Sequence, residues 1–155
     1  MAFNKFDYAL MNTAYVWSDL SHSKIVKVGC VIAKDNRIIT HGYNGMPTHL
    51  ENECEAEDGK SKPEVIHAEH NAILFAAKNG ISLNGCTAYI THSPCVHCAS
   101  MLIVTGIKTV IYNQSYVSRS NGSNIDVFVG SSVKLICMEK TSEKVNRVHW
   151  KKEIR

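Results

Sequence analysis

Two short motifs bring together residue types that bind metal ions and move protons. The first is His67-Ala-Glu69, and the second is Cys95-Val-His-Cys98, preceded by Pro94. Each motif opens a segment predicted to be helical, and one predicted strand, residues 85–91, separates the two segments. A parallel crossover places both helix starts at one sheet edge, where open α/β sheets bind ligands. The sequence therefore predicts one site that contains an imidazole, two thiols and a carboxyl group.

The predicted metal is zinc, with His67, Cys95 and Cys98 as its ligands. Three protein ligands and an open fourth position are typical of catalytic zinc, whereas structural zinc has four protein ligands. The positive ends of two helix dipoles favour the thiolate forms of the cysteines. Bound zinc gives hydroxide at neutral pH, so a nearby proton carrier is needed, and Glu69 is the predicted general acid and base. The ordered pair H-x-E…P-C-x-x-C is the signature of zinc-dependent nucleoside and nucleobase deaminases.

Two other uses of these residues are less consistent with the combined motif. A structural zinc site would need a fourth ligand, for which His97 or His70 could be proposed. A redox role for the two cysteines would leave His67 and Glu69 without a function.

Composition limits the remaining function classes. The chain has 155 residues, is 45% hydrophobic and 20% charged, and carries a formal net charge of +3. These values suit a single domain over residues 1–155, with a core over 4–139 and a charged tail over 140–155. We expect a cytoplasmic protein with reduced cysteines, because no segment resembles a membrane span or a secretory signal. The small basic excess, without a basic-aromatic stripe, argues against a nucleic-acid partner.

The periodicity predicts helices that alternate with strands around a mixed sheet. A helix over 4–21 has Phe6, Leu10, Ala14 and Trp17 on one stripe, and Asp35-Asn36 suits the turn of a β-hairpin. A helix over 67–80 has Ala68, Ala72, Phe75 and Ala76 on one face and ends at Gly80. The other predicted elements are hairpin strands over 26–33 and 37–43, a polar connection over 44–66, strands over 85–91, 107–112 and 133–139, and a helix that Ser93-Pro94 opens and Gly106 ends.

Three stretches resemble the deoxycytidylate (dCMP) deaminases, particularly their phage-encoded members: residues 28–47, 67–80 and 93–112. The Gly-Tyr-Asn-Gly-x-Pro element at 42–47 distinguishes this family from plain cytidine deaminases. The resemblance implies a three-layer α/β/α cytidine-deaminase-like fold with a five-stranded mixed sheet. It also implies hydrolysis of dCMP to dUMP with release of ammonia, which supplies dUMP for thymidylate synthesis. Family members are commonly homohexamers, activated by dCTP with Mg²⁺ and inhibited by dTTP.

The resemblance also assigns roles to particular residues besides the zinc ligands and Glu69. Asn44 matches the residue that holds the deoxyribose, and Tyr116 matches an aromatic residue near the base and phosphate. Ala68 and Ser93 correspond to positions whose backbone lines the pocket. Lys24 and Lys27 are our candidates for the 5′-phosphate.

The effector site is expected over residues 42–45, which include Gly42, Tyr43 and Gly45. Lys78, near the end of the second predicted helix, is a hypothetical contact to an effector base.

Several features leave alternatives open. Position 70 is His where relatives usually carry an apolar residue, and Cys54 with His22 and His49 could belong to a second, structural zinc site. Trp150 suggests that the tail docks on the protein or on a neighbouring subunit, and a disordered tail is the alternative. The alternative functions are a deaminase acting on dCTP or on both nucleotides, a polynucleotide deaminase, and a non-catalytic zinc module.

Overall fold

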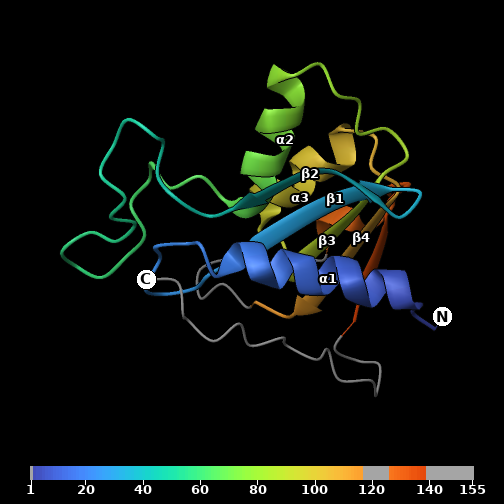
Figure 1. The fold of residues 1–155 in the computed structure, drawn as a ribbon, viewed down its shortest axis with the longest axis horizontal. Coiled ribbons are helices and arrows are strands. Elements are labelled where there is room, and N and C mark those ends of the chain that lie inside the picture. Colours follow the sequence, from blue (N-terminus) through green and yellow to red (C-terminus); the bar gives the residue numbers. More distant parts are fainter. Residues whose placement is uncertain (1, 117–125, 139–155) are drawn as a thin grey trace, which may run out of the picture.

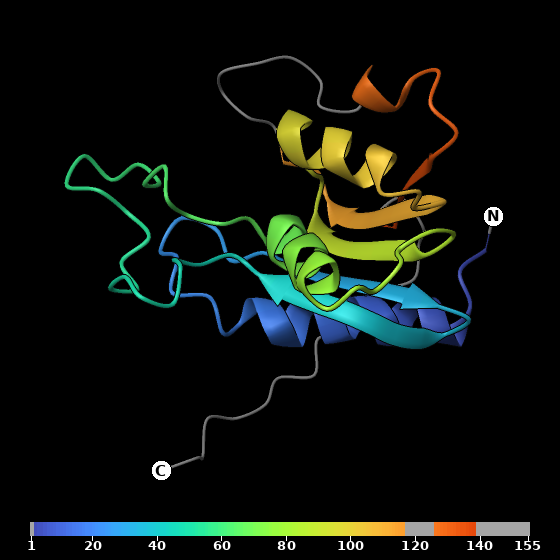
Figure 2. The ribbon, with the colours of Figure 1, turned by 90° about the horizontal axis from the view of Figure 1, so that it is seen from above.

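The structure is a computed structural model, and it describes residues 2–116 and 126–138. These residues form a five-stranded sheet with α1 on one face and α2 and α3 on the other (Figure 1, Figure 2). The predicted three-layer α/β/α fold is therefore confirmed. The elements are α1 (Lys5–Ser18), β1 (Gly29–Lys34), β2 (Arg37–Tyr43), α2 (Ala68–Lys78), β3 (Thr87–His92), α3 (Val96–Val104), β4 (Thr109–Gln114), the 3₁₀ helix η1 (Asp126–Phe128) and β5 (Lys134–Cys137).

The sheet is mixed, as predicted, with the strand order β2-β1-β3-β4-β5. β1 pairs antiparallel with both β2 and β3, whereas the pairs β3–β4 and β4–β5 are parallel. The start of β1 and the ends of β2, β3 and β4 therefore lie at one edge of the sheet. The chain segments that precede or follow these strand ends can meet there, although the sequence separates them widely.

The hairpin turn has the predicted chemistry. Asp35 and Asn36 both have positive φ angles, 51° and 61°. Two consecutive residues of this kind make a type I′ turn, whose twist matches that of the flanking strands. This turn fixes how β2 pairs with β1.

Two hydrophobic clusters hold the layers together. Met11 and Ala14 of α1 pack with Val31 and Tyr89 on one face of the sheet. On the other face, the buried alanines of α2 and Leu102 of α3 pack with residues of β1, β3 and β4. Small alanine side chains let α2 lie close to the sheet, which brings its N-terminus to the edge described above.

The sequence predicted that Phe6 of α1 and Phe75 of α2 face the core, and this prediction was wrong. Phe6 is 43% exposed and Phe75 is 55% exposed. In α1 the predicted residues Leu10 and Ala14 are buried, and Asp7 is buried in place of Phe6. The Asp7 carboxylate accepts a 2.7 Å hydrogen bond from the buried Tyr89 hydroxyl. Helical periodicity permits several stripes, and this long-range hydrogen bond selects one of them.

The predicted start of the third helix was also wrong. α3 begins at Val96 with Cys95 as its N-cap, and the Cys95 sulfur accepts a hydrogen bond from the Cys98 N–H. Ser93, the predicted N-cap, uses its Oγ to accept a 2.8 Å hydrogen bond from the Tyr116 N–H. Because of this shift, Cys95 itself caps the N-terminus of α3.

The predicted tail over 140–155, with Trp150, lies outside the described residues. Within the parts of the chain that the structure describes, no helix has both the length and the apolar character required to cross a membrane.

Candidate active site

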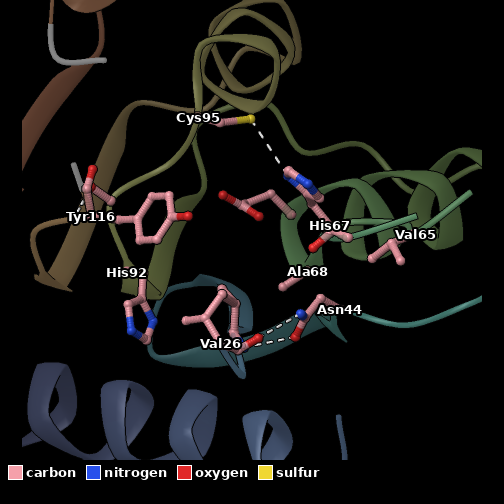
Figure 3. Close-up of a pocket in the computed structure, with 12 residues that line it drawn as sticks. Val26, Asn44, Val65, His67, Ala68, His92, Cys95 and Tyr116 are labelled. Carbon is pink, nitrogen blue, oxygen red and sulfur yellow. Dashed lines mark hydrogen bonds between the residues drawn. The ribbon is translucent and has the colours of Figure 1, made fainter. Parts of the chain in front are cut away.

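The side chains of His67, Cys95 and Cys98 meet where α2 and α3 begin. His67 is the N-cap residue of α2, and the two cysteines occupy the N-cap and first turn of α3. His67 Nδ1 lies 3.5 Å from the sulfur of Cys95 (Figure 3). It also lies 3.5 Å from the sulfur of Cys98. All three donor atoms lie within 4.8 Å of one another. The structure thus brings together the three residues that the sequence predicts as ligands.

This donor group fits zinc. Tetrahedral bonds of about 2.0 Å to nitrogen and about 2.3 Å to sulfur place the two donor atoms about 3.5 Å apart, which is the separation between His67 Nδ1 and each sulfur. Thiolate and imidazole are also ligands that zinc prefers. His97 and His70 are not part of this group, the only one that the described residues form.

The two thiols have opposite acidities. Hydrogen bonding from Cys98, assisted by His67, lowers the pKa of Cys95 to about 3 although burial opposes the shift. The same hydrogen bond to Cys95, together with burial, raises the pKa of Cys98. Hydrogen bonding to Cys95 raises the pKa of His67 above its usual value. These contacts therefore favour the thiolate form of Cys95 and the protonated form of His67.

Glu69, which the sequence predicts as the general acid and base, lies beside the ligand residues. The residue is only 3% exposed and lines the same cavity as His67 and Cys95. Burial raises the pKa of its carboxyl to about 6, while a backbone hydrogen bond and His67 oppose the shift. A carboxyl group with a pKa near neutrality can both accept and donate a proton.

His67, Cys95 and Glu69 lie at one end of an open cavity. Its lining includes the four residues that the family resemblance assigns to substrate binding, namely Asn44, Ala68, Ser93 and Tyr116. The Tyr116 ring points into the cavity (Figure 3).

Asn44 is held by hydrogen bonds to the chain just before β1. Its side-chain oxygen accepts a 2.8 Å hydrogen bond from the Val28 N–H, and its amide nitrogen donates a 2.9 Å hydrogen bond to the Val26 carbonyl (Figure 3). Its own carbonyl accepts a hydrogen bond from the Ser21 hydroxyl. Asn44 therefore shapes the wall that Val26 and Val28 form, and its amide retains a second N–H that a ligand can use.

The two lysines predicted for the 5′-phosphate are placed elsewhere. Lys24 and Lys27 are exposed and do not line the cavity. The Lys27 ammonium lies 3.4 Å from the Asp19 carbonyl, to which it donates. A phosphate role for these lysines stays a prediction.

The residues expected to bind an effector line a second, more open cavity beside β2. Gly42, Tyr43 and Gly45 contribute to it, together with Asn71 and Phe75 of α2. Trp17 stacks on His41 with ring centroids 3.6 Å apart, and it also lies parallel to the Tyr43 ring. Lys78 is exposed and does not line this cavity.

Sequence reasoning missed several residues of the first cavity. His92 is the last residue of β3, and Ser61 and Val65 come from the polar connection 44–66. The rule that ligands bind at the carboxyl ends of parallel strands would have found His92. No pattern in the sequence indicates that the connection folds back to supply Ser61 and Val65.

Two open questions about single residues are answered by their surroundings. Cys54 is 1% exposed, but His22 and His49 do not join it in a metal-binding group among the described residues. His70 is half-buried and lines neither cavity.

Glu55 fixes the connection 44–66 to the chain before β1. Its Oε1 accepts hydrogen bonds from the Ser23 hydroxyl at 2.8 Å and from the N–H groups of Lys24 and Ile25 at 2.9 and 3.4 Å. Burial by itself would raise the pKa of Glu55, but these hydrogen bonds lower it. Across a short hairpin, Glu55 pairs with Ser61, which lines the cavity. One carboxylate therefore joins two walls of the site.

Glu55→Ala is expected to speed amide hydrogen exchange at Lys24 and Ile25 by about tenfold, because both N–H groups lose a charge-assisted acceptor. Exchange measured by NMR checks this expectation. Glu57→Ala removes an exposed carboxylate from the same hairpin and is the matched control. Equal exchange rates in the two variants would contradict the role of Glu55.

A three-layer α/β/α domain with a His–Cys–Cys donor group and a buried glutamate on adjacent helix starts has the features of the zinc-dependent deaminases. Comparison with known proteins agrees with this class. The profile of the cytidine and deoxycytidylate deaminase zinc-binding region matches residues 4–114. The chain belongs to this family, and it is a deaminase.

Two deoxycytidylate deaminases and one solved structure are similar to this protein over most of its length. The deoxycytidylate deaminase of Enterobacteria phage T4 is 32% identical and is matched over 91% of this chain and 93% of its own length. The corresponding phage T2 protein is 34% identical, over 73% of this chain and 82% of its own length. The crystal structure of the cyanophage S-TIM5 dCMP deaminase in complex with dCMP and dUMP superimposes with a TM-score of 0.82 at 37% identity. That match covers 89% of this chain and 100% of the cyanophage chain.

Proposed function

We propose that this deaminase hydrolyses dCMP to dUMP and ammonia. The observation that carries the proposal is the group of three donor atoms, spaced to fit zinc, beside buried Glu69 at one end of an open cavity. The choice of substrate is supported by the names of the phage relatives and by the dCMP and dUMP bound to the cyanophage protein.

The chemistry requires two proton transfers, and Glu69 is positioned to perform both. His67, Cys95 and Cys98 would hold the zinc ion, which would act as a Lewis acid and lower the pKa of water to near neutrality. Glu69 takes a proton from the attacking water and gives it to N3 of the pyrimidine while the water oxygen bonds to C4. Glu69 then carries the proton of the new C4 hydroxyl group to the amino group, the oxygen stays on C4 as a carbonyl, the C4–N bond breaks, and ammonia leaves. The burial of Glu69 keeps bulk water from competing in these transfers.

The remaining cavity residues bind and orient the substrate. Asn44 offers its second amide N–H to the deoxyribose, and the backbone of Ala68 and Ser93 lines the base pocket. Tyr116 packs its ring near the base. The hydrogen bond between Ser93 Oγ and the Tyr116 N–H supports this placement.

Ammonia release from dCMP, dCTP and deoxycytidine, each with and without Mg²⁺, tests the proposed substrate. We expect dCMP to be the preferred substrate. Preferred turnover of dCTP would instead assign the chain to the alternative activity on triphosphates. Silence on all three substrates, with one zinc bound per chain, would favour a polynucleotide substrate or a non-catalytic zinc module.

We further propose that dCTP with Mg²⁺ activates the enzyme and dTTP inhibits it through the second cavity. The support is that Gly42, Tyr43 and Gly45, which the family resemblance assigns to effectors, all line this cavity. Phe75→Ala is expected to abolish activation by dCTP and to preserve basal dCMP turnover, because Phe75 lines only the second cavity. Leu74→Ala, at an adjacent exposed position outside the cavity, is the control. Full activation of the Phe75 variant would place the effector elsewhere.

The cellular context follows from the proposed reaction. The product dUMP would serve thymidylate synthesis in the cytoplasm of the cell. A homohexamer of single-domain chains, residues 1–155, is proposed from the family resemblance. The exposed Phe6 and Val16 on α1 offer apolar surface for subunit contacts.

A further inference from the structure

His92 occupies a part of the active-site cavity that the proposed mechanism leaves without a role. It ends β3 and lines the cavity together with Val26 and Tyr116. In Figure 3 its ring lies across the cavity from Cys95 and His67, so it is far from the reacting end. A substrate whose base sits at the metal ligands would extend its other end toward this side.

The ring of His92 is held in a fixed position. Its Nδ1 lies 2.9 Å from the Oγ1 of Thr91, with which it forms a hydrogen bond. Thr91 is fully buried, and its Oγ1 also accepts a 3.1 Å hydrogen bond from the Gly29 N–H of β1. The imidazole is therefore anchored through the sheet itself, and this pre-organisation reduces the entropy cost of binding a ligand.

The charges around the cavity determine where an anion can lie. The reacting end of the cavity is lined by Glu69 and by the ligand residues His67 and Cys95, and the base occupies this end in the proposed reaction. Lys24 and Lys27 do not line the cavity. Among the lining residues that the structure describes, His67 and His92 are the two basic side chains, and His67 faces the cysteines. His92 is therefore the basic group at the end of the cavity away from the metal ligands.

We propose that His92 contacts the 5′-phosphate of the nucleotide and makes the enzyme select nucleoside monophosphates over free nucleosides. This inference rests on the proposed function and deepens it. An imidazole N–H to a phosphate oxygen is a charge-assisted hydrogen bond, which favours binding of the phosphorylated substrate and does not act on the reacting atoms. The contact should therefore appear in KM more than in kcat.

The test compares dCMP with deoxycytidine in wild type, His92→Asn and His92→Gln. For dCMP we expect kcat/KM to fall by about 10- to 100-fold in the variants, mainly through KM, which is the range for one hydrogen bond to a charged group. For deoxycytidine we expect kcat/KM to stay at the wild-type value. Asn and Gln are two replacements of different length, so one decides the outcome if the other fails to fold. His49→Asn, at an exposed position that lines neither cavity, is the matched control.

The outcomes separate this inference from the proposed function. Wild-type protein that does not deaminate dCMP overturns the proposed function. Wild-type protein that deaminates dCMP, with His92 variants that keep the wild-type KM for dCMP, overturns the inference alone. Equal losses on dCMP and deoxycytidine also overturn it, because they would show that His92 contacts the base or sugar.

Discussion

Glu69→Gln is expected to lower kcat for dCMP by about 10²- to 10⁴-fold, the contribution of a positioned general acid and base. Gln has the size of Glu and can hydrogen-bond, but it cannot carry a proton between water, N3 and the leaving amino group. The steady-state rate of ammonia release measures the effect. The residue is not a member of the metal-binding group, so the variant should retain one zinc per chain by elemental analysis.

The matched control for Glu69→Gln is Glu57→Gln, at an exposed position in the connection 44–66. The control should turn over dCMP at the wild-type rate. A Glu69→Gln protein with wild-type turnover would rule out the proposed proton transfers. Loss of zinc together with activity would mean that Glu69 supports the metal site instead.

Cys98→Ala is expected to remove both the metal and the activity. The Cys98 sulfur is one of three donors around a single point and is 1% exposed, so no nearby water or side chain replaces it easily. Because zinc binds the folded site and not the unfolded chain, the variant should also lose the rise in melting temperature that added zinc gives the wild type. Metal content and calorimetry with and without added zinc measure these changes.

Two other cysteines provide controls for Cys98→Ala. Cys137→Ser changes a half-buried thiol outside the metal-binding group. Cys54→Ala changes a buried thiol in the connection 44–66 and tests the second zinc hypothesis directly. Both variants should retain one zinc per chain. A Cys98→Ala protein that still binds one zinc and deaminates dCMP would show that the catalytic metal lies elsewhere.

The residues of the candidate metal site were predictable because each of the two motifs is short and local in the sequence. His67 and Glu69 are two residues apart, and Cys95 and Cys98 are three apart, so each pair is presented by one helix start. The hairpin turn at Asp35-Asn36 was predictable for the same reason, since two consecutive residues tolerate positive φ angles. The alternation of helices and strands then left few ways to arrange the sheet, and the mixed topology was confirmed.

The sequence did not determine the hydrogen bonds between residues that lie far apart along the chain. The hydrogen bond between Asp7 and Tyr89 joins positions 82 residues apart and turns Phe6 outward. Ser93 contacts Tyr116 instead of capping α3, and Glu55 folds the connection 44–66 back so that Ser61 reaches the site.

These contacts depend on how the layers pack, which no local pattern encodes. Spacing along a chain specifies which residues one helix or turn presents together, and it therefore predicted the fold class and the group that His67, Cys95 and Cys98 form beside Glu69. Tertiary packing alone decided that His92 lies across the cavity from the ligands, that Lys24 and Lys27 do not line it, and that Phe75 borders a second cavity. Each of these placements requires surfaces from separate elements to meet, and the free energy that selects them comes from burial and hydrogen bonds between distant residues.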